Sequence, residues 1–113
     1  MMPHAERAIV PMEKITEYLL SRTHAVGSRK AAFFRQFGFK ENAPDVLRNA
    51  LIAHAAAYMV SRELDSIHGK KYEVSGPLAT PSGRLPMVKT VWMAAGGTPP
   101  RLVTAIPGKG SRQ

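Results

Sequence analysis

The residues best suited to chemistry lie in residues 23–34, which read THAVGSRKAAFF. A loop-like start containing His24 passes into a helix-like end, and Arg29 and Lys30 stand at the junction. A helix start carries partial positive charge and free N–H groups, so two cations there cost about 0.3–1 kcal/mol each unless an anion is bound. The segment therefore predicts an anion site that His24 can enter. The alternative is that His24 caps a loop and the two cations are simply solvated.

Two strand-like segments near the C-terminus supply further polar candidates. In MVKTVWM, alternation puts Thr90 and Trp92 on one face and Lys89 on the other, without saying which face meets the helices. In RLVTAIP, Arg101 and Thr104 fall on opposite faces of an ideal strand. Both reach one site only if Arg101 lies at the mouth of the strand or a bulge intervenes.

Metal and organic cofactor sites are not expected. The chain has no cysteine, and His4, His24, His54 and His68 show neither metal-ligand spacing nor neighbouring carboxylate pairs. His54 lies on the apolar stripe of a helix, where a half-buried, hydrogen-bonded histidine is expected rather than a catalytic one. Trp92 is expected in the core, with base stacking as the alternative. An activity of this chain should therefore depend on neither a metal nor an organic cofactor.

The charge of the chain restricts the class of partner. Sixteen Lys and Arg against eight Asp and Glu give a net charge of +8, and no acidic residue follows Gly76. Such a chain attracts polyanions, and phosphate contacts make binding fall with salt; a solubilising charge is the alternative. The longest apolar run, ALIAHAAAYMV, is too short to span a bilayer, and no signal peptide is evident. We expect a cytoplasmic protein that does not enter a membrane.

The elements that must position these residues follow from the periodicity. Helical spacing predicts helices over residues 12–20, 29–37 and 44–58, with Ser28 and Asn42 as N-caps and Gly38 as a stop. Alternation then predicts strands over residues 62–67, 71–80, 84–94 and 101–107, the first two joined by an HGK turn.

This order predicts an α+β fold, with three N-terminal helices packed on one face of a four-stranded antiparallel meander sheet. The opposite face stays open to solvent or a ligand. We expect a flexible lead-in over residues 1–11, a single domain over 12–107 and a basic disordered tail over 108–113.

Several motifs together resemble a known family. The histidine and glycine of HAVG precede KAAFF. The segments VSGPLATPSGR, VKTVW and PRLVTAIP come later in the chain. The series is similar to a small, uncharacterised bacterial domain family and covers roughly residues 12–107. Members occur as stand-alone proteins, often like the toxin of a toxin–antitoxin pair, and as terminal modules of larger proteins. The order of elements also resembles the fold of metal-independent ribonuclease toxins of the barnase, colicin and RelE types.

This resemblance implies a metal-independent endoribonuclease, the toxin of a toxin–antitoxin pair, in which the 2′-OH of RNA attacks the phosphate. Such an enzyme needs a base, an acid and cations that neutralise the phosphorane. We expect His24 as the acid or base, Lys30 and Arg101 on the scissile phosphate, and Thr104 or Thr90 as a hydrogen-bond donor. Nucleic-acid contacts are expected to extend over Arg29, Arg84, Lys89, Thr90 and Trp92.

The expected partners are RNA and an acidic antitoxin-like protein, and the possibility of a homo-oligomer stays open. One alternative is a non-enzymatic basic module that binds RNA, the ribosome or an acidic partner protein. Another is a structural adaptor with an acidic partner. Cleavage of RNA separates the enzyme from both.

Overall fold

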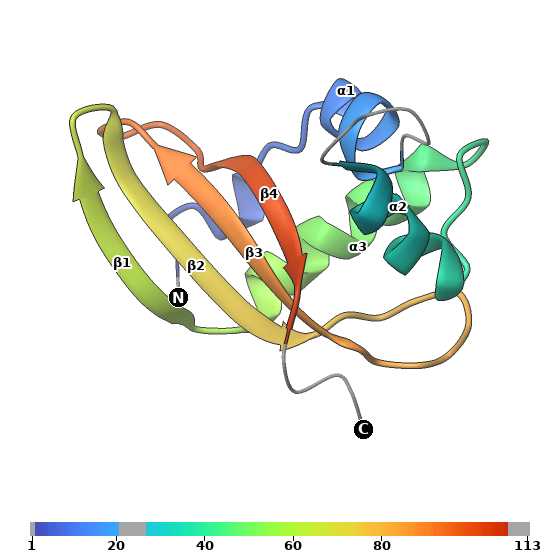
Figure 1. Ribbon diagram of the computed structural model, residues 1–113. Coiled ribbons are helices and arrows are strands. Elements are labelled where there is room, and N and C mark those ends of the chain that lie inside the picture. The colour runs from blue at the N-terminus through green and yellow to red at the C-terminus, as the bar shows by residue number, and fades with distance from the viewer. Residues whose placement is uncertain (1, 21–26, 109–113) are drawn as a thin grey trace.

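The computed structural model describes residues 2–20 and 27–108, so only Gly108 of the expected tail falls within it. The helical half comprises η1 (Ala5–Arg7), α1 (Met12–Lys14), the π-helical turn η2 (Ile15–Leu19), α2 (Gly27–Gln36) and α3 (Pro44–Ala57). The strands are β1 (Val60–Ser66), β2 (Gly69–Pro77), β3 (Met87–Ala94) and β4 (Arg101–Pro107) (Figure 1). They form an antiparallel sheet in the order β1-β2-β3-β4. The predicted α+β fold, helices first and meander sheet second, is confirmed.

The helix starts differ from the expected caps, whereas the expected stop is correct. Helix α2 begins at Gly27, so Ser28 lies inside the helix rather than at its cap. The residue that caps α3 is Ala43, not Asn42, and it makes no side-chain hydrogen bond. Gly38 follows α2 with φ 100°, a conformation that glycine adopts without strain, so it ends the helix as expected.

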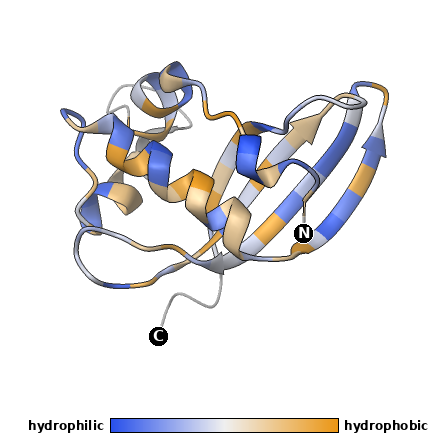
Figure 2. Ribbon diagram, turned by 180° about the vertical axis from the view of Figure 1, so that it is seen from behind, coloured by the Kyte–Doolittle hydropathy of each residue, from blue (hydrophilic) through white to orange (hydrophobic). Residues whose placement is uncertain are grey.

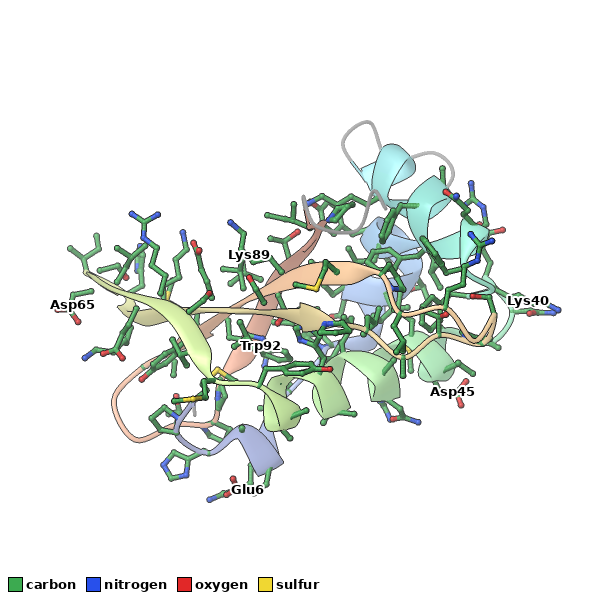
Figure 3. The ribbon with its side chains drawn as sticks, turned by 90° about the horizontal axis from the view of Figure 1, so that it is seen from below. Glu6, Lys40, Asp45, Asp65, Lys89 and Trp92 are labelled. Atoms are coloured by element: carbon green, nitrogen blue, oxygen red, sulfur yellow. The ribbon has the colours of Figure 1, made fainter. Side chains whose placement is uncertain are left out.

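The core lies between α3 and one face of the sheet, and it decides the orientation of β3. Helix α3 covers that face and lies in front of the strands when the molecule is seen from behind (Figure 2). Trp92 points from β3 toward α3, whereas Lys89 points away from it (Figure 3). Phe34 and Phe39 join Trp92 among the largest fully buried side chains. The face that carries Lys89 is therefore the open face of the sheet.

A hydrogen-bonded histidine ties α3 to the middle of the sheet. The Nε2 atom of His54 lies 3.1 Å from the carbonyl oxygens of both Gly76 and Val88. Carbonyl oxygens only accept, so Nε2 carries the proton and Nδ1 is an acceptor 3.3 Å from the Thr90 hydroxyl, whose single proton also faces the Val74 carbonyl oxygen at 3.3 Å. The Trp92 indole donates to the same hydroxyl at 2.9 Å. The prediction of a hydrogen-bonded His54 is confirmed, and its side chain is buried rather than half-buried.

Stability should depend on pH through His54. Burial lowers the pKa of His54 below 6.5, although the two carbonyl contacts act in the opposite direction. The unfolded chain then binds a proton that the folded chain excludes, so the free energy of unfolding falls as the pH drops below 6.5. We expect urea unfolding between pH 6.5 and about 5 to show a loss of at most ~1.4 kcal/mol per pH unit from this group.

Two variants separate His54 from the other histidines in this measurement. His54→Gln should show a smaller pH slope, whereas His68→Gln should keep it, because His68 is exposed in the turn between β1 and β2. The same slope in His54→Gln and in the unmodified protein would show that His54 is not the responsible group.

The first residues pack against the domain. Met2 and Val10 are buried in the core. The carbonyl oxygen of Ile9 accepts the Leu102 N–H at 2.9 Å, which makes a parallel bridge to the outer edge of β4. The described part of the expected lead-in over residues 1–11 therefore packs on the domain through apolar side chains, while its flexibility stays a prediction. Within the described ranges, no helix is long and apolar enough to cross a membrane.

Candidate functional site

Three polar side chains meet where η2 and α2 pack against β4. The ammonium of Lys30 donates to the hydroxyl oxygens of Tyr18 and Thr104, at 2.7 Å each. The two hydroxyl oxygens are 3.4 Å apart. An ammonium has three N–H groups, and these contacts use two of them. Among the described residues nothing takes the third, so it can meet an oxygen of an incoming anion.

A β-bulge in β4 sets the direction of Thr104. Val91 pairs with Thr104, but the next residue of β3 pairs with Leu102, so Val103 is an extra residue. The bulge puts Arg101 and Thr104 on the same face of the strand, the open face, where an unbroken strand would separate them. With this bulge, Arg101 and Thr104 can face the same site.

Tyr18 is positioned by a π-helical turn. The N–H of Leu20 bonds to the carbonyl oxygen of Ile15 at 2.8 Å, five residues back, and Ile15 is fully buried and anchors the turn. Single π turns inside helices are frequent at functional sites. The half-buried ring of Tyr18 has two cations over it, with Lys30 Nζ 5.0 Å and Lys14 Nζ 5.6 Å from its centroid.

This environment changes the acidity of the phenol. The hydrogen bond from Lys30 is the largest cause that lowers the pKa of Tyr18 below 10.0, followed by the bond with Thr104; the charges of Lys30 and Lys14 add smaller effects. Partial desolvation opposes these effects. A phenol with a lowered pKa exchanges its proton more readily near neutral pH.

We expect Tyr18 to titrate at a lower pH than a free tyrosine and to move back toward 10.0 in Lys30→Met. NMR of ring-labelled tyrosine measures this, and Tyr18→Phe assigns the resonance among the three tyrosines. An unchanged titration in Lys30→Met would show that Lys30 does not control the phenol.

A groove of about 560 Å³ continues from the cluster along α1 and η2. It is lined by Pro11, Glu13, Lys14, Glu17, Tyr18 and Arg101. Tyr18 belongs to both the groove and the cluster, so the groove that the exposed Arg101 borders adjoins the contact of Lys30 with Tyr18. The cluster and the adjoining groove together hold three cations (Lys14, Lys30 and Arg101), a phenol and a hydroxyl, which suit a phosphate group, and also the carboxylates of Glu13 and Glu17.

The sequence matches, over residues 1–109, the model of a family described as a domain of unknown function, DUF6883. The chain belongs to the DUF6883 family. This match confirms the expectation that the chain belongs to an uncharacterised domain family. No protein among those with a curated function matches the DUF6883 chain.

The DUF6883 chain is similar in structure to a chain of a contact-dependent growth inhibition toxin–immunity protein complex from Klebsiella pneumoniae 342. The TM-score is 0.73 with 16% sequence identity, covering 88% of this chain and 99% of that chain. At this identity the likeness shows a shared fold.

Two other cations were expected to contact nucleic acid, Lys89 and Arg84, and the structure places them in different parts of the domain. Lys89 lies on the open face of the DUF6883 sheet and forms an ion pair with Glu73 at 3.5 Å. Arg84 is exposed in the loop between β2 and β3, and that loop bonds to the carbonyl of Phe37, beyond the C-terminal end of α2. Since Lys30 lies in the first turns of α2, Arg84 is at the opposite end of this helix.

Two expected nucleic-acid contacts are corrected by the structure. Thr90 and Trp92 are fully buried beneath α3. The Thr90 hydroxyl contacts His54 and accepts the indole N–H of Trp92, so it does not face a ligand. Neither side chain can reach RNA from this position. His24 and the side chain of Arg29 lie outside the described residues. No group of three His, Cys, Asp or Glu side chains suited to a metal ion occurs in the part of the chain that the structure describes.

Tyr18 is the site residue that sequence analysis of the DUF6883 chain missed. It falls with Ile15 and Leu19 on one face of the first helix, so helical spacing alone groups it with side chains that pack. Its hydroxyl was the available signal, because a tyrosine placed between a core and a charged segment usually bonds to a polar partner.

Proposed function

We propose that this DUF6883 domain is a toxin that cleaves RNA, using the 2′-OH of the substrate as nucleophile. The observation that carries the proposal is the contact of Lys30 with Tyr18 and Thr104 beside a groove that Arg101 borders. The reaction requires proton transfer and neutralisation of a phosphorane, and these side chains are of the types that supply both.

In the proposed reaction Tyr18 removes the proton from the 2′-OH, and the 2′-oxygen forms a bond to phosphorus. Lys30 and Arg101 neutralise the phosphorane, and the Thr104 hydroxyl donates to one of its oxygens. The bond from phosphorus to the 5′-oxygen then breaks, and His24 supplies the proton that this oxygen takes up. The products are a 2′,3′-cyclic phosphate and a free 5′-hydroxyl. The lowered pKa of Tyr18 supports its role as the base.

Two observations support the toxin assignment. The fold is shared with a chain of a complex of a growth inhibition toxin and its immunity protein. The net charge of +8 is the sign expected of a protein that acts on a polyanion, and a partner that covers this site would be acidic. We propose RNA as the substrate and an acidic immunity or antitoxin protein as the partner.

The test is incubation of the purified protein with total RNA in EDTA, combined with induced expression in a bacterial host. We expect RNA to be cleaved without added metal and growth to stop. His24→Ala and Lys30→Ala should abolish both effects. Binding to RNA that falls with salt, without cleavage under any condition, would replace the enzyme with the non-enzymatic binding module considered above.

A further inference from the structure

The groove beside Tyr18 holds more polar groups than a phosphate requires. Its wall formed by α1 and η2 carries the exposed side chains of Glu13 and Glu17, opposite Arg101 of β4. Within the described ranges, neither carboxylate makes an ion pair or hydrogen bond with a side chain of the groove, and Arg101 has no such partner. Carboxylates repel a phosphate, so their place in this groove calls for a ligand group that donates hydrogen bonds.

We propose that the groove binds a guanine base of the RNA next to the scissile phosphate and that Glu17 determines this specificity. This inference rests on RNA being the substrate. On its Watson–Crick edge guanine offers two neighbouring N–H donors, at N1 and N2, which match the two oxygens of one carboxylate. Adenine and cytosine each offer one amino group there, and uracil offers one imino group. Only guanine meets both oxygens of Glu17 together.

The remaining walls of the groove suit the same base. Tyr18 provides an aromatic ring for an unstacked base, which would take the place of Lys14 over that ring, and such stacking is sequence-tolerant. Arg101 and Lys14 supply donors for the O6 and N7 acceptors of guanine. The groove volume of about 560 Å³ is in the range of small-ligand sites. Tyr18 also contacts Lys30 and Thr104, so a base on this ring would lie next to the cluster.

The inference is tested with short oligonucleotides that carry a 2′-deoxy sugar at the central nucleotide, so that they cannot be cleaved there. The central base is guanine, inosine, adenine, cytosine or uracil, and fluorescence anisotropy gives the dissociation constants. We expect guanine to bind roughly 10-fold or more tightly than inosine, which lacks only the 2-amino group. Glu17→Gln should remove this preference, because its amide offers one acceptor and one donor.

Glu6→Gln is the matched control, since Glu6 is an exposed carboxylate in η1, away from α2 (Figure 3). It should keep the preference for guanine. Equal affinity for all five bases, or a preference that survives in Glu17→Gln, would overturn the inference, while RNA cleavage would still support the proposed function. A guanine preference that depends on Glu17, without any RNA cleavage, would support the groove and contradict the ribonuclease.

Discussion

Lys30→Met is expected to lower the rate of RNA cleavage by about 10²- to 10³-fold, the usual loss when one donor to a developing oxyanion is removed. The substitution acts in two ways. It removes the cation nearest to Tyr18 and Thr104, and it removes the largest cause of the lowered pKa of Tyr18. The phosphorane then loses a charge partner, and the base loses the hydrogen bond that contributes most to its lowered pKa.

The pH dependence of the rate separates these two contributions. The rate of the unmodified protein should rise with pH until Tyr18 is ionised, whereas Tyr18→Phe should lose this dependence. Lys30→Arg should recover part of the rate because it restores the charge, although a planar guanidinium meets the two hydroxyls differently.

Lys40→Met is the matched control for Lys30→Met. Lys40 is exposed beyond the end of α2, pointing away from the domain (Figure 3). It should leave the rate within twofold of the unmodified protein. Thermal unfolding confirms that each variant is folded. If a folded Lys30→Met cleaves RNA at the normal rate, the cluster is not the catalytic site.

Trp92→Ala is expected to lower the free energy of unfolding by about 3–5 kcal/mol, as for other large aromatic side chains removed from a core. Trp92 is fully buried between β3 and α3. Its removal leaves a cavity and deprives the Thr90 hydroxyl of the indole donor, which weakens the network around His54. Chemical denaturation followed by circular dichroism measures the loss. Tryptophan fluorescence does not serve here, because Trp92 is the single tryptophan and the variant lacks it.

Trp92→Phe separates packing from a role in RNA binding. It should cost less stability than Trp92→Ala because most of the volume is kept, and it should leave RNA affinity unchanged. A large loss of RNA affinity in folded Trp92→Phe would restore base stacking as the role of Trp92. A loss of stability below about 1 kcal/mol in Trp92→Ala would contradict the packing described for the core.

Local periodicity was enough to predict the order of the helices and strands. The change from helical spacing to alternation after the third helix predicted the α+β meander. A period of 3.6 residues lines up apolar side chains on one face of a helix, whereas a period of two lines them up on one face of a strand. The charge of Lys30 and the hydroxyl of Thr104 made both residues candidates for phosphate contacts, but nothing in the sequence indicated that they contact each other. The apolar stripe around His54 was sufficient to predict a hydrogen-bonded histidine, since a polar group there must be satisfied.

Only the tertiary structure decided which of these residues share a site. Alternation says that Thr90 and Trp92 lie on one face, but the position of α3 decides that this face is buried. The π turn that presents Tyr18 and the extra residue at Val103 depart from the ideal helical and strand repeats, so a periodic pattern does not contain them. Both are stabilised by contacts between segments distant in the chain. The physical reason is that local spacing determines which side chains point together, whereas non-local packing determines what they meet.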